Sequence, residues 1–382
     1  MRRITLVQVG IGTIGGAVVE QVLANRERWR GLGLTIEIGT LVGRGGALVG
    51  PGGATLPDDI LRAAVEGRRF GVPLGELAGE DAEIVPAEGA LERIAVASPT
   101  VLVDAGAGEQ TAMLDLRALE VGASVVLSNK APLAMPTEDP TTAALWGAAG
   151  PAGWLRYEAT CGAGLPVMST LRGLLDTGDE VLEIQGALSG TLGAIFSDVT
   201  AGQPFSAAVR AAKERGYTEP DPRDDLSGLD VARKALILAR TIGRRADLTE
   251  IEVESLVPEH LRDVPVEAFL ERVGDLDAAM AERAAAAKAA GGSLKYVATV
   301  TPEGPLTVGV RAIPATGVLG ALQGPENVVS IRTHRYDAYP LTVSGPGAGA
   351  AVTAAGMLAD VLALANGPLA AQAAAPVEED GL

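Results

Sequence analysis

Apolar and polar positions along roughly the first 150 residues follow a pattern that predicts strands separated by helices. Short β-rich runs occupy residues 4–9, 34–42, 100–106 and 124–130, and apolar residues recur at helical spacing over residues 17–30 and 111–122. Strands that alternate with helices are typical of an α/β protein with a doubly wound parallel sheet. Residues 43–90 carry many turn signals and predict a loop-rich insertion with one helix near residues 58–66.

After residue 154 the pattern changes to one that predicts an α+β region. The β-rich runs at residues 180–188, 293–300 and 306–313 bracket a long helical stretch between about residues 205 and 290. A strongly periodic helix pattern follows at residues 352–365, and the residues after it predict a frayed end. We therefore expect a first domain over residues 1–156, completed by residues 345–382, with a second domain inserted over residues 157–344.

A glycine-rich turn joins the first predicted strand to the first predicted helix. In VQVGIGTIGG, Gly10, Gly12 and Gly15 have the spacing Gly-x-Gly-x-x-Gly. Glycine permits the tight turn and the close approach of backbone to a pyrophosphate, and the helix N-terminus offers free N–H groups. A plain strand–turn–helix without a ligand is the alternative reading. The context favours a dinucleotide site that also includes Thr13 and Ile14.

The end of the second predicted strand bears on which dinucleotide binds. An acidic residue there would bind a ribose diol and repel a 2′-phosphate. This strand is followed by GRGG, without an acid, and Arg44 could form a bidentate pair with a 2′-phosphate. A solvated loop arginine is the alternative. The sequence favours NADP, with NAD possible.

Ionisable residues are concentrated in residues 216–234, GYTEPDPRDDLSGLDVARK. Ser227 is a candidate N-cap for the next helix, with Asp230 as the acidic half of a capping box. On that helix Asp230 and Lys234 are four residues apart and share a face. Lys234 also falls between apolar residues, so a half-buried lysine beside a carboxylate is a candidate proton acceptor. A solvated capping loop is the alternative reading.

The composition excludes several classes of site. A net charge of −17 argues against nucleic acid or an anionic membrane as a partner. Cys161 is the single cysteine, which rules out an intrachain disulfide and favours a reducing compartment. Two histidines leave little material for a histidine-rich metal site or a Ser-His-Asp triad. No run approaches eighteen apolar residues, so we expect no membrane span and a cytoplasmic protein.

Five blocks of this sequence resemble the homoserine dehydrogenase family, in that family's order. They are VVLSNKAPLA (125–134), YEATCGAGLPVMSTLRGLL (157–175), GALSGTLGAIF (186–196), GYTEPDPRDDLSGLDVARKALILAR (216–240) and GPGAGAAVTAAGMLADVL (345–362). The resemblance implies a Rossmann domain with an inserted α+β domain for catalysis and dimerisation. It also implies NAD(P)-dependent interconversion of L-homoserine and L-aspartate 4-semialdehyde, a step of threonine and methionine biosynthesis. We expect the short form, without a kinase or regulatory domain, as a homodimer.

The resemblance also assigns roles to individual residues. The substrate ammonium would be held by Glu219 and Asp225, with Tyr217 and Thr191 lining the pocket. Lys234, held by Asp230, would act with Lys130 in taking the hydroxyl proton. On the cofactor side the matching residues are Asn129, Lys130, Gly347 and Gly349. Backbone carbonyls of a monovalent cation site, expected to take sodium, would come from Glu158, Cys161, Ala163 and Leu165.

Two departures from the family's pattern lie on the cofactor side. Ala105 replaces the Thr or Ser that commonly follows the third strand's aspartate, and Ala350-Ala351 stand where an acid is common. Two other functions remain open. One is a dinucleotide-binding sensor that has lost catalysis, and the other is an oxidoreductase for a related amino alcohol. A strand within residues 298–343 is the expected dimer interface.

Overall fold

The computed structural model describes residues 2–94, 99–150 and 153–370, and contacts divide the chain into two compact units. Unit 1 holds the described residues of Met1–Thr160 and Gly349–Leu382, and unit 2 is Cys161–Ala348. The sequence predicted these boundaries at 156/157 and 344/345. The predicted frayed end, residues 371–382, lies outside the described residues.

Unit 1 is built on a seven-stranded sheet in the order β4-β3-β2-β1-β5-β6-β7. The strands are β1 (Arg2–Val9), β2 (Leu34–Gly43), β3 (Gly46–Val49), β4 (Glu83–Val85), β5 (Thr100–Asp104), β6 (Ser124–Leu127) and β7 (Leu155–Arg156). Five neighbouring strands of this sheet run parallel, as predicted, and they are β2, β1, β5, β6 and β7. β3 and β4 add antiparallel strands, so the prediction of a loop-rich insertion was wrong there. These strands are three and four residues long, and the surrounding turn signals hid them.

The helices of unit 1 cover both faces of this sheet. They are α1 (Thr13–Gly31), α2 (Asp58–Arg69), α3 (Ala87–Ile94), α4 (Ala112–Glu120), α5 (Ala131–Ala134), α6 (Pro140–Ala148) and α15 (Ala350–Asn366), with 3₁₀ turns η1 (Pro51–Gly53), η2 (Leu74–Leu77), η3 (Glu109–Thr111) and η4 (Glu158–Thr160). The chain moves from β1 to β2 in one direction and from β5 to β6 in the other. Since such crossovers are right-handed, α1 and α4 lie on opposite faces. The strand order therefore reverses between β1 and β5, where α/β folds bind ligands.

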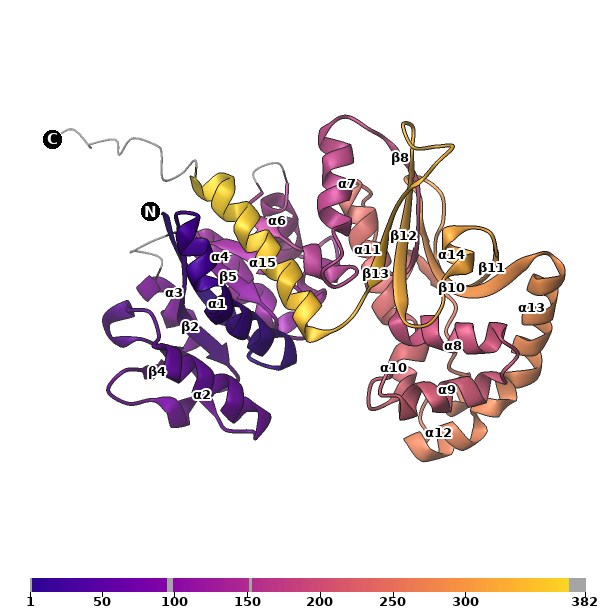
Figure 1. The fold of residues 1–382 in the computed structure, drawn as a ribbon, viewed down its shortest axis with the longest axis horizontal. Helices are drawn as coiled ribbons and strands as arrows, with labels where there is room; N and C mark the ends of the chain where they lie inside the picture. The colour runs from indigo at the N-terminus through magenta and orange to yellow at the C-terminus, as the bar shows by residue number, and fades with distance from the viewer. Residues whose placement is uncertain (1, 95–98, 151–152, 371–382) are drawn as a thin grey trace. The chain divides into compact units, whose positions relative to one another are not determined.

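The C-terminal helix α15 completes the core of unit 1, where it lies alongside α1 (Figure 1). Met357, Val361 and Leu364 pack there with Val18 and Val22 of α1. Among the described residues the helix over Ala350–Ala370 is long and apolar enough to cross a membrane, and half of it is buried inside the structure. Its packing against α1 is that of a core helix.

Unit 2 contains a six-stranded sheet in the order β13-β12-β8-β10-β11-β9. The strands are β8 (Val181–Ala187), β9 (Ile251–Val253), β10 (Gly292–Val300), β11 (Leu306–Pro314), β12 (Glu326–Thr333) and β13 (Leu341–Pro346). All neighbouring pairs are antiparallel except β9 and β11. β9 interrupts the stretch predicted as helical over residues 205–290. The sequence pattern did not reveal it, because three residues are too few to show the alternation of apolar and polar side chains of a strand.

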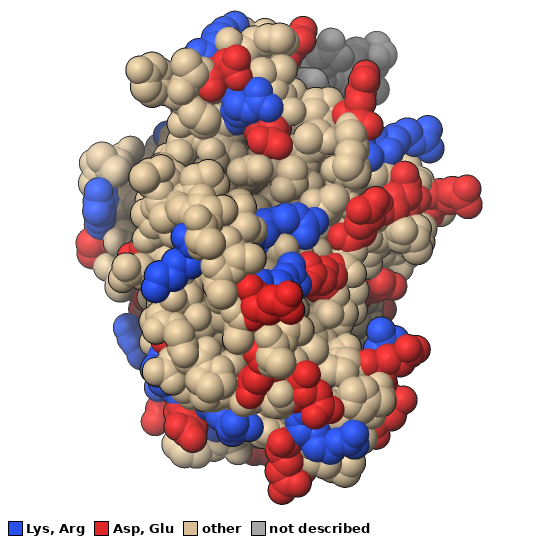
Figure 2. Space-filling model, turned by 90° about the vertical axis from the view of Figure 1, so that its right-hand side faces the viewer, with Lys and Arg blue, Asp and Glu red and all other residues tan. Residues whose placement is uncertain are grey.

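One face of this sheet is covered by helices, and the other carries polar side chains together with a small apolar cluster in which Leu319 and Leu322 pack with Ala187 and Val328. The elements of unit 2 besides the strands are α7 (Val167–Asp176), α8 (Gly190–Thr200), α9 (Phe205–Glu214), α10 (Pro222–Leu226), α11 (Leu229–Thr241), α12 (Val266–Arg272), α13 (Asp277–Ala289), α14 (Val318–Ala321), η5 (Leu248–Glu250), η6 (Glu259–Leu261) and η7 (Val273–Leu276). Phe196 of α8 stacks on Tyr296 of β10, on the buried face. By register the opposite face carries Gln185, Thr299 and Ser330, each half-buried. In Figure 2, acidic and basic side chains are interspersed over the face in view.

Candidate active site

The glycine-rich turn lies where the strand order of unit 1 reverses. Gly10 follows β1 with φ 74°, and a Cβ there would lie 2.9 Å from the carbonyl oxygen of Ala105, which follows β5. A Cβ on Gly15 would lie 1.8 Å from the carbonyl oxygen of Gly10. The Gln8 amide supports the turn by donating to the carbonyls of Val9 and Gly10, both at 3.0 Å. Only glycine fits at positions 10 and 15.

The outer side of this turn is open. Gly12 is the N-cap of α1 and is exposed, and a Cβ on it would meet no atom within 4 Å. Thr13 and Ile14 begin the helix, so their backbone N–H groups belong to its first turn, where a helix has no internal acceptors. The residues present thus form a cradle that fits the pyrophosphate of a dinucleotide.

Arg44 lies at the carboxyl end of β2, in the two-residue turn to β3, and its side chain is exposed. The carboxyl ends of parallel strands form one edge, so Arg44 and the glycine turn lie at the same edge of the sheet. This placement suits contact with a cofactor at that edge.

A buried hydrogen-bond network holds Asn129 after β6. The Asn129 amide lies 2.8 Å from the carbonyl oxygen of Gly108, 2.9 Å from Thr111 Oγ1 and 3.2 Å from an Asp104 carboxylate oxygen. Thr111 Oγ1 in turn donates to Asp104 at 2.7 Å. Burial raises the pKa of the Asp104 carboxyl above its ordinary value, although these hydrogen bonds oppose the shift. The network fixes the backbone that carries Lys130, the half-buried N-cap of α5.

In unit 2, Lys234 on α11 is 9% exposed and held at its ammonium from two sides. Nζ lies 2.8 Å from Asp230 Oδ2, one helical turn earlier, and donates to the carbonyl oxygen of Leu188 at 2.7 Å. Leu188 lies between β8 and α8. The predicted Asp230–Lys234 pair is therefore present, and the Leu188 carbonyl is a partner that the sequence pattern does not indicate.

The predicted capping box at the start of α11 was wrong. The N-cap is Gly228, with φ 74°, and a Cβ there would lie 2.0 Å from the Tyr296 hydroxyl oxygen. Ser227 Oγ instead donates to the carbonyl of Asp224 at 2.8 Å. Tyr296 excludes a side chain at the cap position, and Asp230 pairs with Lys234 rather than with a cap.

The predicted substrate residues Glu219, Asp225 and Thr191 are neighbours in unit 2. Asp225 Oδ2 accepts from the backbone N–H of Glu219 at 2.8 Å, and Asp225 Oδ1 lies 2.9 Å from Thr191 Oγ1. Burial raises the pKa of the Asp225 carboxyl above its ordinary value; these hydrogen bonds oppose the shift, and the charges of Asp230 and Asp224 add to it. A cationic group that approached Asp225 would relieve this cost, since it would favour the ionised form.

Tyr217 is joined to this cluster through its backbone, because its carbonyl oxygen is 2.5 Å from Thr191 Oγ1. Its side chain lines a cavity of about 800 Å³ in unit 2 together with Ser197 and Lys295. Neither Asp225 nor Lys234 lines that cavity. The assignment of Tyr217 to the substrate pocket stays a prediction.

The predicted cation ligands lie on a tight, buried segment that spans the boundary of the two units. Cys161 is buried and not part of a disulfide, and its thiol donates to the carbonyl of Lys234 at 3.6 Å. Ala163 has φ 55°, the one positive φ at a non-glycine among the described residues. The backbone N–H of Glu158 donates to Asp360 of α15 at 2.7 Å, and the Leu165 carbonyl accepts from Val167. Among the described residues no group of three or more His, Cys, Asp or Glu could hold a metal.

The two predicted cofactor glycines near the C-terminus fall in different units. Gly347 follows β13 in unit 2, and Gly349 is the N-cap of α15 in unit 1. Residues 345 and 346 still belong to β13, so the predicted start of the returning segment at residue 345 was too early. The strand continues because Gly345 pairs with Asn327.

The sequence of this chain is similar to a known family and to several known proteins. Residues 166–362 match the family model described as homoserine dehydrogenase. The chloroplastic bifunctional aspartokinase/homoserine dehydrogenase 2 of Arabidopsis thaliana is 47% identical over 212 residues, 55% of this chain and 23% of that protein. The chain thus spans about a quarter of the length of the plant relatives it matches. The homoserine dehydrogenase of Saccharomyces cerevisiae is 39% identical over 275 residues, 70% of this chain and 76% of that enzyme.

The fold of this chain is similar to solved structures over nearly its whole length. A Candida auris protein of unknown function is 31% identical with a TM-score of 0.81, over 96% of this chain and 98% of that one. A hyperthermophilic archaeal homoserine dehydrogenase in complex with NADPH is 25% identical with a TM-score of 0.69, over 94% of this chain and 96% of that one. The two-unit fold is therefore shared with these proteins.

Proposed function

The chain belongs to the homoserine dehydrogenase family, and we propose that it interconverts L-homoserine and L-aspartate 4-semialdehyde with NADP(H). The observation that carries this proposal is the buried Lys234 side chain, whose Nζ lies 2.8 Å from Asp230 in a charged segment, residues 216–234, that contains no histidine. Oxidation of an alcohol to an aldehyde requires a group that takes the hydroxyl proton as hydride leaves carbon. A lysine held in place in a largely dry site can supply that group.

The substrate is a zwitterion, and the carboxylates of unit 2 suit its ammonium. Asp225 has both oxygens engaged by Thr191 and by the Glu219 N–H, so its position is fixed, while the Glu219 side chain is exposed. Because the pKa of Asp225 is raised, the carboxylate form is lost as pH falls through that raised value. We expect KM for homoserine to increase on the acid side at a higher pH than an ordinary aspartate would cause.

The cofactor, when bound, accepts or donates the hydride. Gly10, Gly12, Gly15 and the first turn of α1 would hold its pyrophosphate: glycine at positions 10 and 15 permits the tight turn, and the space beside Gly12 is open for the ligand. Arg44, exposed at the same edge of the sheet, would pair with a 2′-phosphate. Asn129 and Lys130 would lie on the nicotinamide side, where the Asp104 network orders them. NADP is therefore favoured over NAD.

Lys130 and Lys234 are proposed to move the proton together. In the oxidative direction a neutral lysine amine takes the proton of the substrate hydroxyl, and in the reductive direction an ammonium returns it to the aldehyde oxygen. Asp230 and the Leu188 carbonyl hold Lys234 in one rotamer for this task. Each oxidation of the alcohol therefore transfers one hydride to the nicotinamide and releases one proton.

Three further assignments extend this proposal. Sodium would be bound by the backbone carbonyls of Glu158, Cys161, Ala163 and Leu165, and the left-handed backbone of Ala163 supports an unusual carbonyl arrangement there. A homodimer would form through the part of the unit 2 sheet that carries Thr299 and Ser330, within the strands of residues 298–343. The enzyme would act in the cytoplasm.

A spectrophotometric assay tests the proposed reaction. Purified protein is incubated with L-homoserine and either NADP⁺ or NAD⁺, and the absorbance of the reduced nicotinamide is followed. Growth that requires homoserine supports the proposal, and the faster cofactor tests the role of Arg44. Folded protein that binds NADPH but is silent with homoserine would favour a sensor, and activity on another amino alcohol would favour a related oxidoreductase.

A further inference from the structure

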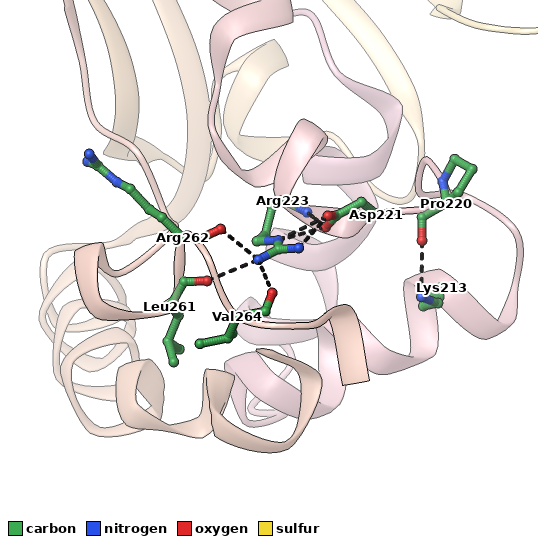
Figure 3. Close-up of polar contacts among 7 residues, drawn as sticks. All are labelled: Lys213, Pro220, Asp221, Arg223, Leu261, Arg262 and Val264. Atoms are coloured by element: carbon green, nitrogen blue, oxygen red, sulfur yellow. Dashed lines mark hydrogen bonds and ion pairs between the residues drawn. The ribbon is translucent and has the colours of Figure 1, made fainter. Parts of the chain in front are cut away.

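Arg223, on α10, joins two parts of unit 2 that are far apart in sequence (Figure 3). Its Nη1 lies within hydrogen-bond distance of three backbone carbonyl oxygens, those of Leu261 at 3.2 Å, Arg262 at 2.7 Å and Val264 at 2.6 Å. Leu261 is the last residue of η6, and the other two lie between η6 and α12. The carbonyls at the end of a short helix have no partner within it, so one guanidinium satisfies acceptors that would otherwise need water.

The other edge of the same guanidinium binds Asp221, at the start of α10. Arg223 Nε lies 3.0 Å from both Asp221 carboxylate oxygens, and Nη2 lies 2.6 Å from Oδ2. Asp221 Oδ1 also accepts from the backbone N–H of Arg223 at 2.9 Å and thereby caps α10. The Arg223 side chain is 16% exposed, and its guanidinium carbon lies 5.6 Å from the Phe269 ring centroid. Each of the three guanidinium nitrogens thus has a hydrogen-bond partner.

Asp221 and Asp225, two carboxylates of residues 217–225, therefore differ in their partners. Asp221 is neutralised by Arg223, and the hydrogen bonds and charge of Arg223 lower the pKa of its carboxyl. Asp225, four residues later near the other end of α10, has no cation partner among the described residues and carries the raised pKa described above. One carboxylate is committed to the fold, and the other is in a position to receive a substrate cation.

We propose that Arg223 is a positioning residue for the substrate: it fastens the loop of residues 217–225 to Leu261–Val264 and reserves Asp221 for the protein, so that Glu219 and Asp225 alone receive the ammonium. The inference rests on the proposed homoserine dehydrogenase activity and deepens it. A lysine cannot replace this arginine, because a single ammonium cannot bridge a carboxylate and three carbonyls on opposite edges.

The test compares Arg223→Lys and Arg223→Ala with Lys213→Met as a control. Lys213 also fastens this loop, through one 3.1 Å bond from Nζ to the Pro220 carbonyl, but it lies away from the three carbonyls that Arg223 binds (Figure 3). We expect KM for homoserine to rise at least tenfold in Arg223→Ala and several-fold in Arg223→Lys. kcat should change less than KM, and the Kd for NADPH should stay at the wild-type value. Lys213→Met should alter KM less than threefold.

Thermal melts and far-UV circular dichroism show whether each variant folds. If Arg223→Ala fails to fold, the KM of Arg223→Lys alone tests the proposal. A folded Arg223 variant with the wild-type KM would overturn the positioning role. So would a parallel loss of NADPH binding and turnover, which would indicate general damage to the fold. A wild-type protein without homoserine activity would instead overturn the proposed function, and with it this inference.

Discussion

Replacement of Lys234 by methionine removes the ammonium and keeps an apolar side chain of similar length. In the structure the loss concerns two contacts, the 2.8 Å pair with Asp230 and the 2.7 Å bond to the Leu188 carbonyl. Val231 and Leu238, one turn before and after Lys234 on α11, are buried as it is. We therefore expect Lys234→Met to fold and to bind NADPH like the wild type.

The expected effects of Lys234→Met on stability and on kcat differ in size. Asp230 is about half exposed, so loss of its pair contributes only about 0–1 kcal/mol to the free energy of unfolding. The freed carbonyl of Leu188 adds about 1–3 kcal/mol if water does not reach it. Loss of a proton-transfer group lowers kcat by about 10²–10⁴-fold. Catalysis should therefore fall far more than stability.

Initial rates of homoserine oxidation with saturating NADP⁺ give kcat, and NADPH titration gives Kd. The matched control is Asp224→Asn, which removes an exposed carboxylate of the same loop and should keep kcat within about threefold of wild type. Asp230→Asn should fall between the two, because Lys234 keeps its bond to Leu188. A folded Lys234→Met variant with wild-type kcat would refute the proton-transfer role.

Three other changes test separate parts of the structure. Asp115 on α4 is fully buried, and neither of its carboxylate oxygens has a hydrogen-bond partner among the described residues. Burial keeps the pKa of Asp115 well above its ordinary value, so as pH rises the unfolded chain ionises first and the wild type loses stability. Denaturant melts of Asp115→Asn should show a gain of about 1–3 kcal/mol at neutral pH and little gain at acid pH; an equal gain at both would contradict this. Arg44→Ala should raise KM for NADP⁺ by about 10–100-fold and leave that for NAD⁺ nearly unchanged; equal changes would exclude contact with the 2′-phosphate. Gly10→Ala should weaken NADPH binding at least tenfold by titration and lower the melting temperature, because its Cβ meets the Ala105 backbone, whereas Gly12→Ala, with no protein atom near its Cβ, should weaken binding without lowering the melting temperature; wild-type affinity in a folded Gly12→Ala variant would contradict the cradle.

Local patterns in the sequence were enough to predict the parallel strands of unit 1 and the glycine turn. The run of residues 4–9 and the turn Gly10–Gly15 are adjacent in sequence, so their relation needs no distant contact. The pair of Asp230 and Lys234 is likewise fixed by the helical repeat. The residues 46–49 and 83–85 could not be recognised, because short antiparallel edge strands depend on partners for their identity.

Contacts between distant residues account for the rest of the candidate site. The partner of Lys234 is a backbone carbonyl 46 residues away, which carries no residue-type signal. The same holds for Arg223, whose carbonyl partners lie 38 to 41 residues later. The displacement of the helix cap from Ser227 to Gly228 depends on Tyr296, which sits on a strand far along the chain.

The central claim is that this protein transfers a hydride from the carbinol carbon of L-homoserine to a nicotinamide. L-Homoserine carrying two deuterium atoms at that carbon, incubated with the protein and NADP⁺, tests it most directly by mass spectrometry of both products. The account predicts NADPH one mass unit heavier than unlabelled NADPH and a semialdehyde that keeps one deuterium. Unlabelled NADPH, or no homoserine-dependent NADPH from folded protein, would contradict it.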